Sequence, residues 1–322
     1  MSRSCFARAF ASALGIALAM IPAWLIAEDA PPEFKKLPGG LEITIAGKPF
    51  ATYVYQDEKI LRPYFANVHA PSGVQVTRNH PPVEGQDPTD HDTMHPGIWL
   101  GFGDINGADF WRNKGRVIHE AFIDNPAAES NVLLFRVRDR YESVGGEVIG
   151  HAVGAYAIIN AGSVGAYAID IKVVFTSAKT LIFGDQEEMG LGIRVATPMS
   201  VKQGGLLVNG DGLVGEKQVW GKQADWCDYS GRIGGVAAGI LLVPSPKNFR
   251  RSWFHARDYG LMCANPFGQN AFTGGEKSAI RVEPGDKLEL TFGILIHGEC
   301  TDAELAKWHA ETLKVLAEIT FP

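Results

Sequence analysis

The sequence predicts an all-β protein, a large antiparallel β-sandwich closed by one C-terminal α-helix. Apolar runs recur along the chain, and clusters of Gly, Asn, Asp or Pro separate them, which is typical of strands joined by turns. The clear helical pattern with a start signal lies near the C-terminus. Many strands followed by one helix favour two packed sheets that carry a helix.

The strand pattern predicts two hairpins. Residues 41–45 and 50–55 alternate on either side of a glycine turn. VGAYAI occurs at 153–158 and again at 164–169, which indicates a hairpin with similar arms rather than a repeat array. Further strands are expected at 132–137, 155–159, 166–175, 191–196, 236–243 and 288–296.

The C-terminal helix is predicted over residues 301–317. Thr301 and Glu304 have the spacing of a capping box. An apolar stripe then follows at helical spacing, formed by Leu305, Trp308, Leu313 and Leu316.

The N-terminus has the layout of a secretory signal peptide. Arg3 and Arg8 precede an uncharged run that ends at Ala27, just before Glu28. We therefore expect a signal peptide at 1–27, a secreted or periplasmic location, and one β-sandwich domain over 28–322 with no later membrane span. An uncleaved membrane anchor is the alternative, because the apolar run is nearly long enough to cross a bilayer.

The net charge bears on the binding partners, and the cysteine count limits the disulfides. The net charge is −6, and loss of two arginines with the signal peptide would make it −8. An acidic chain without a basic cluster is a poor nucleic-acid binder, so no nucleic-acid partner is expected. Cys227, Cys263 and Cys300 remain beyond residue 27, so at most one internal disulfide can form, and its members stay open.

Residues 77–113 interrupt the strand pattern with His, Asp, Pro, Gly and Trp, and a polar loop of this length is usually functional. Asp92 and His95 are its candidate catalytic residues, because carboxylate and imidazole transfer protons near neutral pH. We expect no cofactor, and a divalent metal held by His80, His91 and His95 is the weaker alternative. These side chains could instead hold the loop in shape by hydrogen bonds.

Aromatic side chains cluster with polar ones and suit a carbohydrate ligand. Tryptophan presents a flat apolar face to the C–H side of a sugar ring. The predicted strand at 253–259 places His255, a third catalytic candidate, on one face with Trp253 and Arg257. The candidate substrate-binding residues are Arg62, Trp99, Asp104, Trp111, Glu188, Arg194, Trp226, Trp253 and Arg257. Glu187 and Glu188 could divide acid and base roles in glycoside hydrolysis, or could be solvated charges at a turn.

Several blocks resemble an uncharacterised bacterial family commonly labelled "methane oxygenase PmoA". They are LRPYF (61–65), HPGIW (95–99), GDINGADFW (103–111), VWGKQADWCDYSG (219–231) and WFHARDYGLMCANPFG (253–268). Members commonly carry an HPHHRG-like stretch, whereas residues 92–97 here contain fewer histidines. The membrane enzyme that owns the label spans the bilayer many times, so its function does not transfer to a chain without such spans. The family is similar to secreted carbohydrate-active sandwiches, so the resemblance implies a mutarotase-like supersandwich.

Three functions follow as hypotheses. The first is a carbohydrate-active enzyme of glycoside hydrolase, lyase or epimerase type, with Asp92, His95 or His255 as acid or base. The second is a non-catalytic carbohydrate-binding protein. The third is a metal-dependent oxygenase, as the family label suggests. The enzyme hypothesis requires the loop at 80–111 and the strand at 253–259 to meet.

Overall fold

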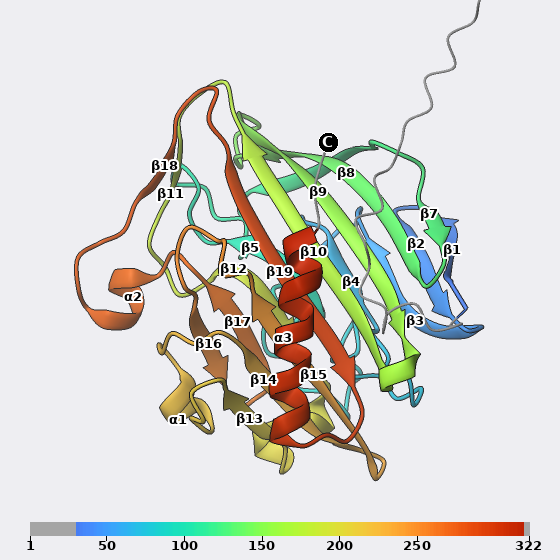
Figure 1. Cartoon of the computed structure of the whole chain (residues 1–322). Helices are drawn as coiled ribbons and strands as arrows, with labels where there is room; N and C mark the ends of the chain where they lie inside the picture. Colours follow the sequence, from blue (N-terminus) through green and yellow to red (C-terminus); the bar gives the residue numbers. More distant parts are fainter. Residues whose placement is uncertain (1–29, 319–322) are drawn as a thin grey trace, which may run out of the picture.

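Two large antiparallel sheets pack face to face in the computed structural model, which describes residues 30–318 (Figure 1). The predicted signal peptide at 1–27 lies outside the described residues. The eight-stranded sheet has the order β1 (Pro32–Leu37), β2 (Gly40–Ile45), β3 (Lys48–Val54), β4 (Tyr64–Ala66), β5 (Ile98–Phe102), β12 (Met189–Arg194), β17 (Leu261–Asn265) and β16 (Trp253–Arg257).

The second sheet has nine strands. Its order is β13 (Leu206–Asn209), β14 (Cys227–Ile233), β15 (Val236–Pro244), β19 (Leu288–His297), β10 (Ala166–Thr176), β9 (Val148–Ala161), β8 (Val132–Glu142) and β6 (Arg116–Phe122), with β7 (Ala127–Glu129) paired to β8. A small third sheet pairs β11 (Leu181–Phe183) with β18 (Ile280–Val282). Short helices α1 (Glu216–Val219) and α2 (Gln269–Thr273), the 3₁₀ turns η2 (Gly162–Val164), η3 (Thr197–Met199) and η4 (Val201–Gln203), and the long helix α3 (Asp302–Glu318) complete the fold.

The core lies between the two large sheets. Ile98 and Leu191 of the first sheet and Ile169 and Phe292 of the second belong to one buried apolar cluster. Side chains alternate along each strand, so the next residues point away from this core. The prediction of a large antiparallel sandwich with one C-terminal helix is confirmed, since every run proposed as a strand coincides with one and both predicted hairpins form, as β2–β3 and β9–β10.

The prediction of a continuous polar loop from 77 to 113 is wrong in one place. Residues 98–102 form β5, a buried strand inside the eight-stranded sheet between β4 and β12. The run Ile-Trp-Leu-Gly-Phe is apolar enough to be covered on both faces, whereas alternation alone predicts strands with one polar face. The irregular loop therefore spans 77–97.

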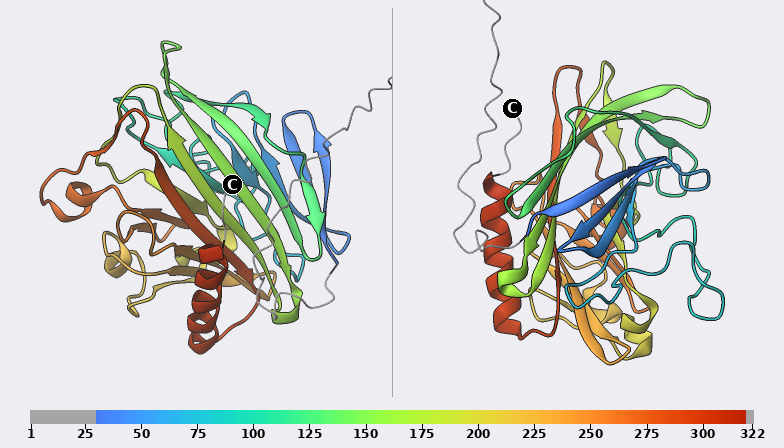
Figure 2. Two further views of the ribbon diagram at one scale, coloured as in Figure 1. Left: turned by 45° about the horizontal axis from the view of Figure 1, so that its top comes forward. Right: turned by 90° about the vertical axis from the view of Figure 1, so that its right-hand side faces the viewer.

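Helix α3 lies on the outer face of the nine-stranded sheet, on the opposite side of the molecule from the loop at 77–97 (Figure 2). The Thr301 amide donates to Glu304 Oε2 at 2.8 Å, and the Glu304 amide donates to Thr301 Oγ1 at 3.3 Å. The predicted capping box and helix are thus confirmed. Its apolar stripe packs Leu305, Trp308 and Leu316 against β15 and β19.

The structure also bears on the cysteines and on membrane-spanning helices. Cys227, Cys263 and Cys300 are all free thiols, so the disulfide left open by the sequence does not form in residues 30–318. Within the same residues, no helix is both long and apolar enough to cross a bilayer.

The buried carboxyl of Asp170 in β10 should make the free energy of unfolding depend on pH. Asp170 is buried opposite Gly293 of β19, and burial raises the pKa of its carboxyl to about 8. The folded protein therefore retains a proton that the unfolded chain releases from about pH 4 upward. Stability should fall as pH rises from about 4 to about 8 and level off above that range.

We expect Asp170→Asn to remove this dependence. Between about pH 5 and about pH 8, the free energy of unfolding of the parent should fall by roughly 2–4 kcal/mol relative to the variant, because each pKa unit is about 1.4 kcal/mol. Urea denaturation at several pH values measures both curves. Parallel curves would mean that this carboxyl ionises in the folded protein as it does in water.

Candidate functional site

The predicted loop and the predicted strand meet on the outer face of the eight-stranded sheet. Trp99 of β5 pairs with Gly192 of β12, Gly192 pairs with Cys263 of β17, and Cys263 pairs with His255 of β16. Their neighbours Ile98, Leu191, Met262 and Phe254 face the core, so these four residues form a row on the outer face. Three strand spacings, about 14 Å of backbone, separate the ends of the row. We call this row and the side chains around it the outer-face site.

A glycine floor sets the position of the Trp99 indole. A Cβ at Gly192 would lie 2.5 Å from Trp99 Cζ2, and a Cβ at Gly101 would lie 3.0 Å from Trp111 Cε3. Only glycine leaves room for the two indoles at these positions. Trp99 and Trp111, two of the candidate substrate-binding residues, are each only 1% exposed, so neither presents an open indole face to a sugar.

Four nearly parallel rings rise from the sheet. Successive centroids from Trp99 to His95, His91 and Tyr259 are 5.0, 4.8 and 6.0 Å apart, with interplanar angles of 15°, 11° and 11°. His95 and His91 come from the loop, and Tyr259 comes from the turn after β16. We call these four rings the ring column. The ring column connects the loop to the far side of the site, and His95 covers the face of Trp99.

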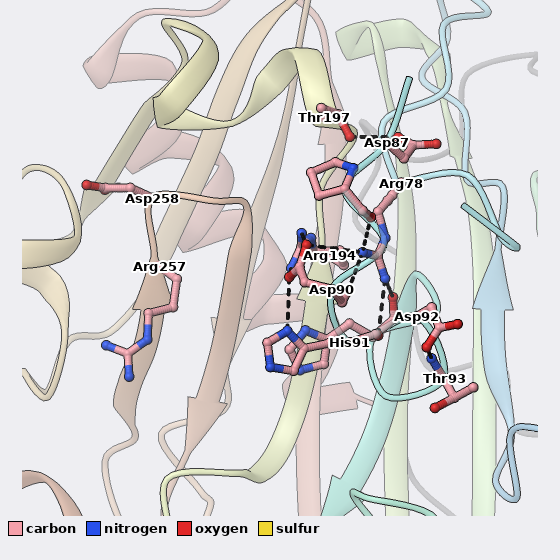
Figure 3. Close-up of polar contacts among 12 residues, drawn as sticks. Arg78, Asp87, Asp90, His91, Asp92, Thr93, Arg194, Thr197, Arg257 and Asp258 are labelled. Carbon is pink, nitrogen blue, oxygen red and sulfur yellow. Dashed lines mark hydrogen bonds and ion pairs between the residues drawn. The ribbon is translucent and has the colours of Figure 1, made fainter. Parts of the chain in front are cut away.

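Two buried arginines fix the loop above the sheet. Arg194 of β12 donates two hydrogen bonds of 3.1 Å to the Asp90 carboxylate and stacks over Tyr259, with 4.3 Å from its Cζ to the ring centroid. Arg78 donates to the carbonyl oxygens of Pro88, Asp90, His91 and His95 at 2.7–3.2 Å. Figure 3 shows both arginines reaching Asp90. Burial opposes ionisation of Asp90, but the hydrogen bonds from Arg194 and His91 lower its pKa to about 2.

Arg62 has a similar structural position rather than an open binding position. It is buried, and its guanidinium donates to the carbonyl oxygens of Met94, Phe110 and Trp111 and to Asn113 Oδ1. Most of its donors are therefore used by the chain itself, and the residue ties the loop to the segment after β5.

His255 and Glu187 form the candidate acid–base pair. His255 Nδ1 lies 3.2 Å from the Glu187 carbonyl oxygen, which can only accept, so Nδ1 carries the hydrogen and Nε2 presents a lone pair. Nε2 lies 3.6 Å from Glu187 Oε2. Burial and the charge of Arg257 lower the pKa of His255 to about 3, so the ring is neutral. Burial raises the pKa of Glu187, although Arg257 offsets part of that rise.

Three buried ring nitrogens in the outer-face site have no hydrogen-bond partner within residues 30–318. They are His95 Nδ1, Trp99 Nε1 and His255 Nε2. Such groups are rare in folded proteins, because each one forfeits its hydrogen bonds to water. His95 is also neutral, since burial and nearby positive charges hold its pKa well below the usual value. The site therefore holds unpaired polar atoms just beneath its surface.

The cations around the pair are already matched. Arg257 Nη2 lies 3.2 Å from Glu187 Oε2, and its Nη1 lies 3.2 Å from Glu216 Oε1 of α1. Arg112 pairs with Asp109 at 3.0 Å and with Glu188. Because each guanidinium has a carboxylate partner, the site suits an uncharged ligand better than an anion.

The other predicted residues do not join this arrangement. Asp92 is exposed and accepts a hydrogen bond from the Thr93 amide, on the side away from Arg194 (Figure 3). Asp104 accepts from the Gly107 amide in a turn. Trp226 packs with the cluster under α3, on the other sheet. Trp253 is buried in the adjoining row and stacks on Phe272 of α2.

Sequence reasoning missed the residues that organise the site. Asp90, Arg78, Arg112 and Glu216 were not singled out, and Glu187 was noted only as half of a carboxylate pair. The sequence signal for Asp90 was weak, because it stands in a loop with several other acidic residues.

The three candidate metal ligands do not converge. His80 packs edge-on against Tyr64 at 5.2 Å, whereas His91 and His95 stack on each other. Across residues 30–318, no group of three or more His, Cys, Asp or Glu side chains could hold a metal ion.

A separate groove of about 510 Å³ lies near β2 and β3, between Thr52, Asn67 and His80, and no residue of the outer-face site lines it.

The chain belongs to a family of unknown function (DUF6807), whose model matches residues 40–311. No curated protein matches the chain. This membership defines the class of protein without assigning an activity.

Solved structures share only a remote likeness with the chain. A galactose mutarotase-like protein from Clostridium acetobutylicum is 9% identical with a TM-score of 0.38, and the match covers 85% of this chain and 100% of that one. An α-galactosidase from Lactobacillus brevis is 7% identical with a TM-score of 0.39, over 86% of this chain and 40% of that one. A GH36 α-galactosidase from Geobacillus stearothermophilus in complex with stachyose is 10% identical with a TM-score of 0.36, over 83% and 40%. The chain thus spans about 40% of the length of these two galactosidases, and no activity follows from the likeness.

We predict that Asp90→Asn loosens the loop at 77–97. The variant leaves Arg194 buried without its ionic partner, which should cost about 1–3 kcal/mol of unfolding free energy. Asp92→Asn is the matched control in the same loop, and it should stay within about 0.5 kcal/mol of the parent. Urea denaturation and the rate of proteolysis within the loop measure both effects. Equal behaviour of the two variants would contradict the anchoring role of Asp90.

Proposed function

We propose that this chain is a carbohydrate-active enzyme that transfers protons at an uncharged sugar bound to the outer-face site. The observation that carries the proposal is the neutral His255 ring with its Nε2 lone pair 3.6 Å from Glu187 Oε2. Imidazole and carboxyl groups are the side chains that most often carry general acid–base catalysis, and here they lie within reach of one ligand. Glu187 is about one-third exposed, at 34%, so a ligand can reach it from solvent.

The two groups have complementary roles in this proposal. His255 Nε2 accepts a proton from a sugar hydroxyl, and Glu187, whose raised pKa favours the protonated carboxyl, delivers a proton to a second oxygen of the same sugar. At an anomeric centre this exchange opens the ring and needs no charged intermediate on the sugar.

The charge pattern favours an isomerase or epimerase over a glycoside hydrolase. Hydrolysis by the usual routes employs two carboxyl groups that both face the glycosidic bond. Here Glu188 is engaged by Arg112, and Glu187 has an imidazole as its neighbour instead. A lyase that acts on an acidic sugar would also need an unmatched cation, and Arg112 and Arg257 are both paired.

A non-catalytic carbohydrate-binding protein is the second candidate. It would bind a sugar beside the exposed Glu187 carboxyl and would carry out no proton transfer. The oxygenase suggested by the PmoA-like resemblance remains a prediction from sequence. Export through residues 1–27 is likewise a proposal, and the N-terminal sequence of the protein recovered from its native compartment would test it.

The enzymatic proposal predicts a specific loss of activity. A panel of neutral aldoses and oligosaccharides is assayed by NMR for anomeric exchange, epimerisation and cleavage. His255→Gln keeps a donor for the Glu187 carbonyl but removes the base, and Glu187→Gln removes the acid. Each should lower the rate about 10²–10⁴-fold, because a positioned acid or base contributes about that much.

His151→Gln is the matched control, since His151 lies in β9 of the other sheet. It should retain the parental rate. Parental rates in both His255→Gln and Glu187→Gln would overturn the catalytic assignment. Sugar binding that is weakened in these variants, without turnover by the parent, would establish the binding protein instead.

A further inference from the structure

A second polar arrangement lies on the other sheet, away from the outer-face site. Cys300 Sγ is 3.5 Å from Nδ1 of His297, the last residue of β19. His297 Nε2 is 2.8 Å from Asp228 Oδ2 of β14. Thiol, imidazole and carboxylate therefore stand in a line, with one ring nitrogen toward the sulfur and the other toward the acid.

Two hydrogen-bond acceptors favour the protonated form of His297. Besides Asp228, the ring faces the Gly298 carbonyl oxygen, which lies 2.8 Å from Nδ1 and can only accept. Both nitrogens must carry hydrogen to satisfy these two acceptors. Burial opposes the charge, but the attraction of Asp228 raises the pKa of His297 to about 10.

The fold holds this ring in place. A Cβ at Gly239 of β15 would lie 2.3 Å from His297 Cε1, so a glycine is required beside it. Trp308 of α3 packs on the other side, with ring centroids 5.3 Å apart. The imidazolium cannot turn away from the sulfur without disturbing the packing of α3.

Cys300 differs from the other two described thiols. Cys227 and Cys263 are fully buried, whereas Cys300 is partly exposed. It directly precedes Thr301, which caps α3, so the residue stands next to the positive end of a 17-residue helix. Nearby acidic residues oppose this effect, but Glu299 is paired with Arg232 and Glu304 accepts the cap hydrogen bonds. Asp302 is the remaining carboxylate next to the cap.

We propose that Cys300 is a nucleophilic thiol that undergoes exchange with small disulfides, with His297 and Asp228 as its positioning residues. The Cys300 thiolate attacks one sulfur of the disulfide, a new S–S bond forms, and the original S–S bond breaks. The second sulfur leaves as a thiolate with the electron pair. Cys300 is thereby oxidised and the leaving sulfur is reduced, so that the exchange balances.

The experiment uses the neutral probe 4,4′-dithiodipyridine with the folded chain at about pH 7. Release of the thiopyridone measures the rate, and Cys300→Ser shows which part of the signal belongs to this residue. The two buried cysteines react only after unfolding and so report any loss of structure. We expect Cys300 to react about tenfold faster than it does in Asp228→Asn, where the charge on His297 is no longer supported.

A second measurement covers the case in which Asp228→Asn does not fold. At a fixed pH of about 7, Cys300 of the parent should react about tenfold faster with the same probe than glutathione does, because the His297 ring faces the sulfur and supports the attacking thiolate. A rate equal to that of glutathione, or slower, would overturn the proposal. An equal rate in the parent and in a folded Asp228→Asn would overturn it as well.

Discussion

The outer-face site depends on the Arg194–Asp90 ion pair. Arg194 ends β12, where it pairs with Leu261 of β17 and its amide donates to the Gly97 carbonyl oxygen at 2.7 Å, and its guanidinium is almost completely buried. A buried guanidinium requires a partner, because leaving the charge unpaired in a low dielectric costs several kcal/mol. Asp90 supplies that partner from a loop that has no regular structure of its own. The ion pair thereby places His91 and His95 above Trp99, and the ring column then carries the constraint to Tyr259.

Two glycines leave the space that the stacked rings need. Gly101 and Gly192 leave the sheet surface bare where the indole of Trp99 lies flat. Larger side chains would lift the indole, the two stacked imidazoles and the loop together. The acid–base pair stands at the other end of the same row, where β16 forms the edge of the sheet. Rigid strands therefore hold His255, while Glu187 approaches from the segment just before β12, so the two groups come from different parts of the chain.

The sequence predicted the fold well because alternation and turn residues are local signals. The capping box of α3 and the paired VGAYAI arms needed no information about distant residues. The site was only partly predictable for the same reason. His95, His255, Arg194 and Arg257 could be chosen by residue type, but Asp90 and Glu187 became important only through contacts 104 and 70 positions away in the chain. Trp99 and Trp111 were expected to bind the substrate, but both are almost fully buried, and the burial of an indole cannot be read from its polar neighbours in sequence alone.

The proposed chemistry requires a neutral His255 ring with its hydrogen on Nδ1. An NMR titration of the histidine side chains, with His255→Gln for assignment, measures both the charge and the tautomer. We expect the His255 ring to show the Nδ1–H tautomer and to remain neutral from about pH 8 down to about pH 4, in keeping with a pKa of about 3. Protonation of His255 near pH 6.5, the ordinary value for a solvated imidazole, would contradict it.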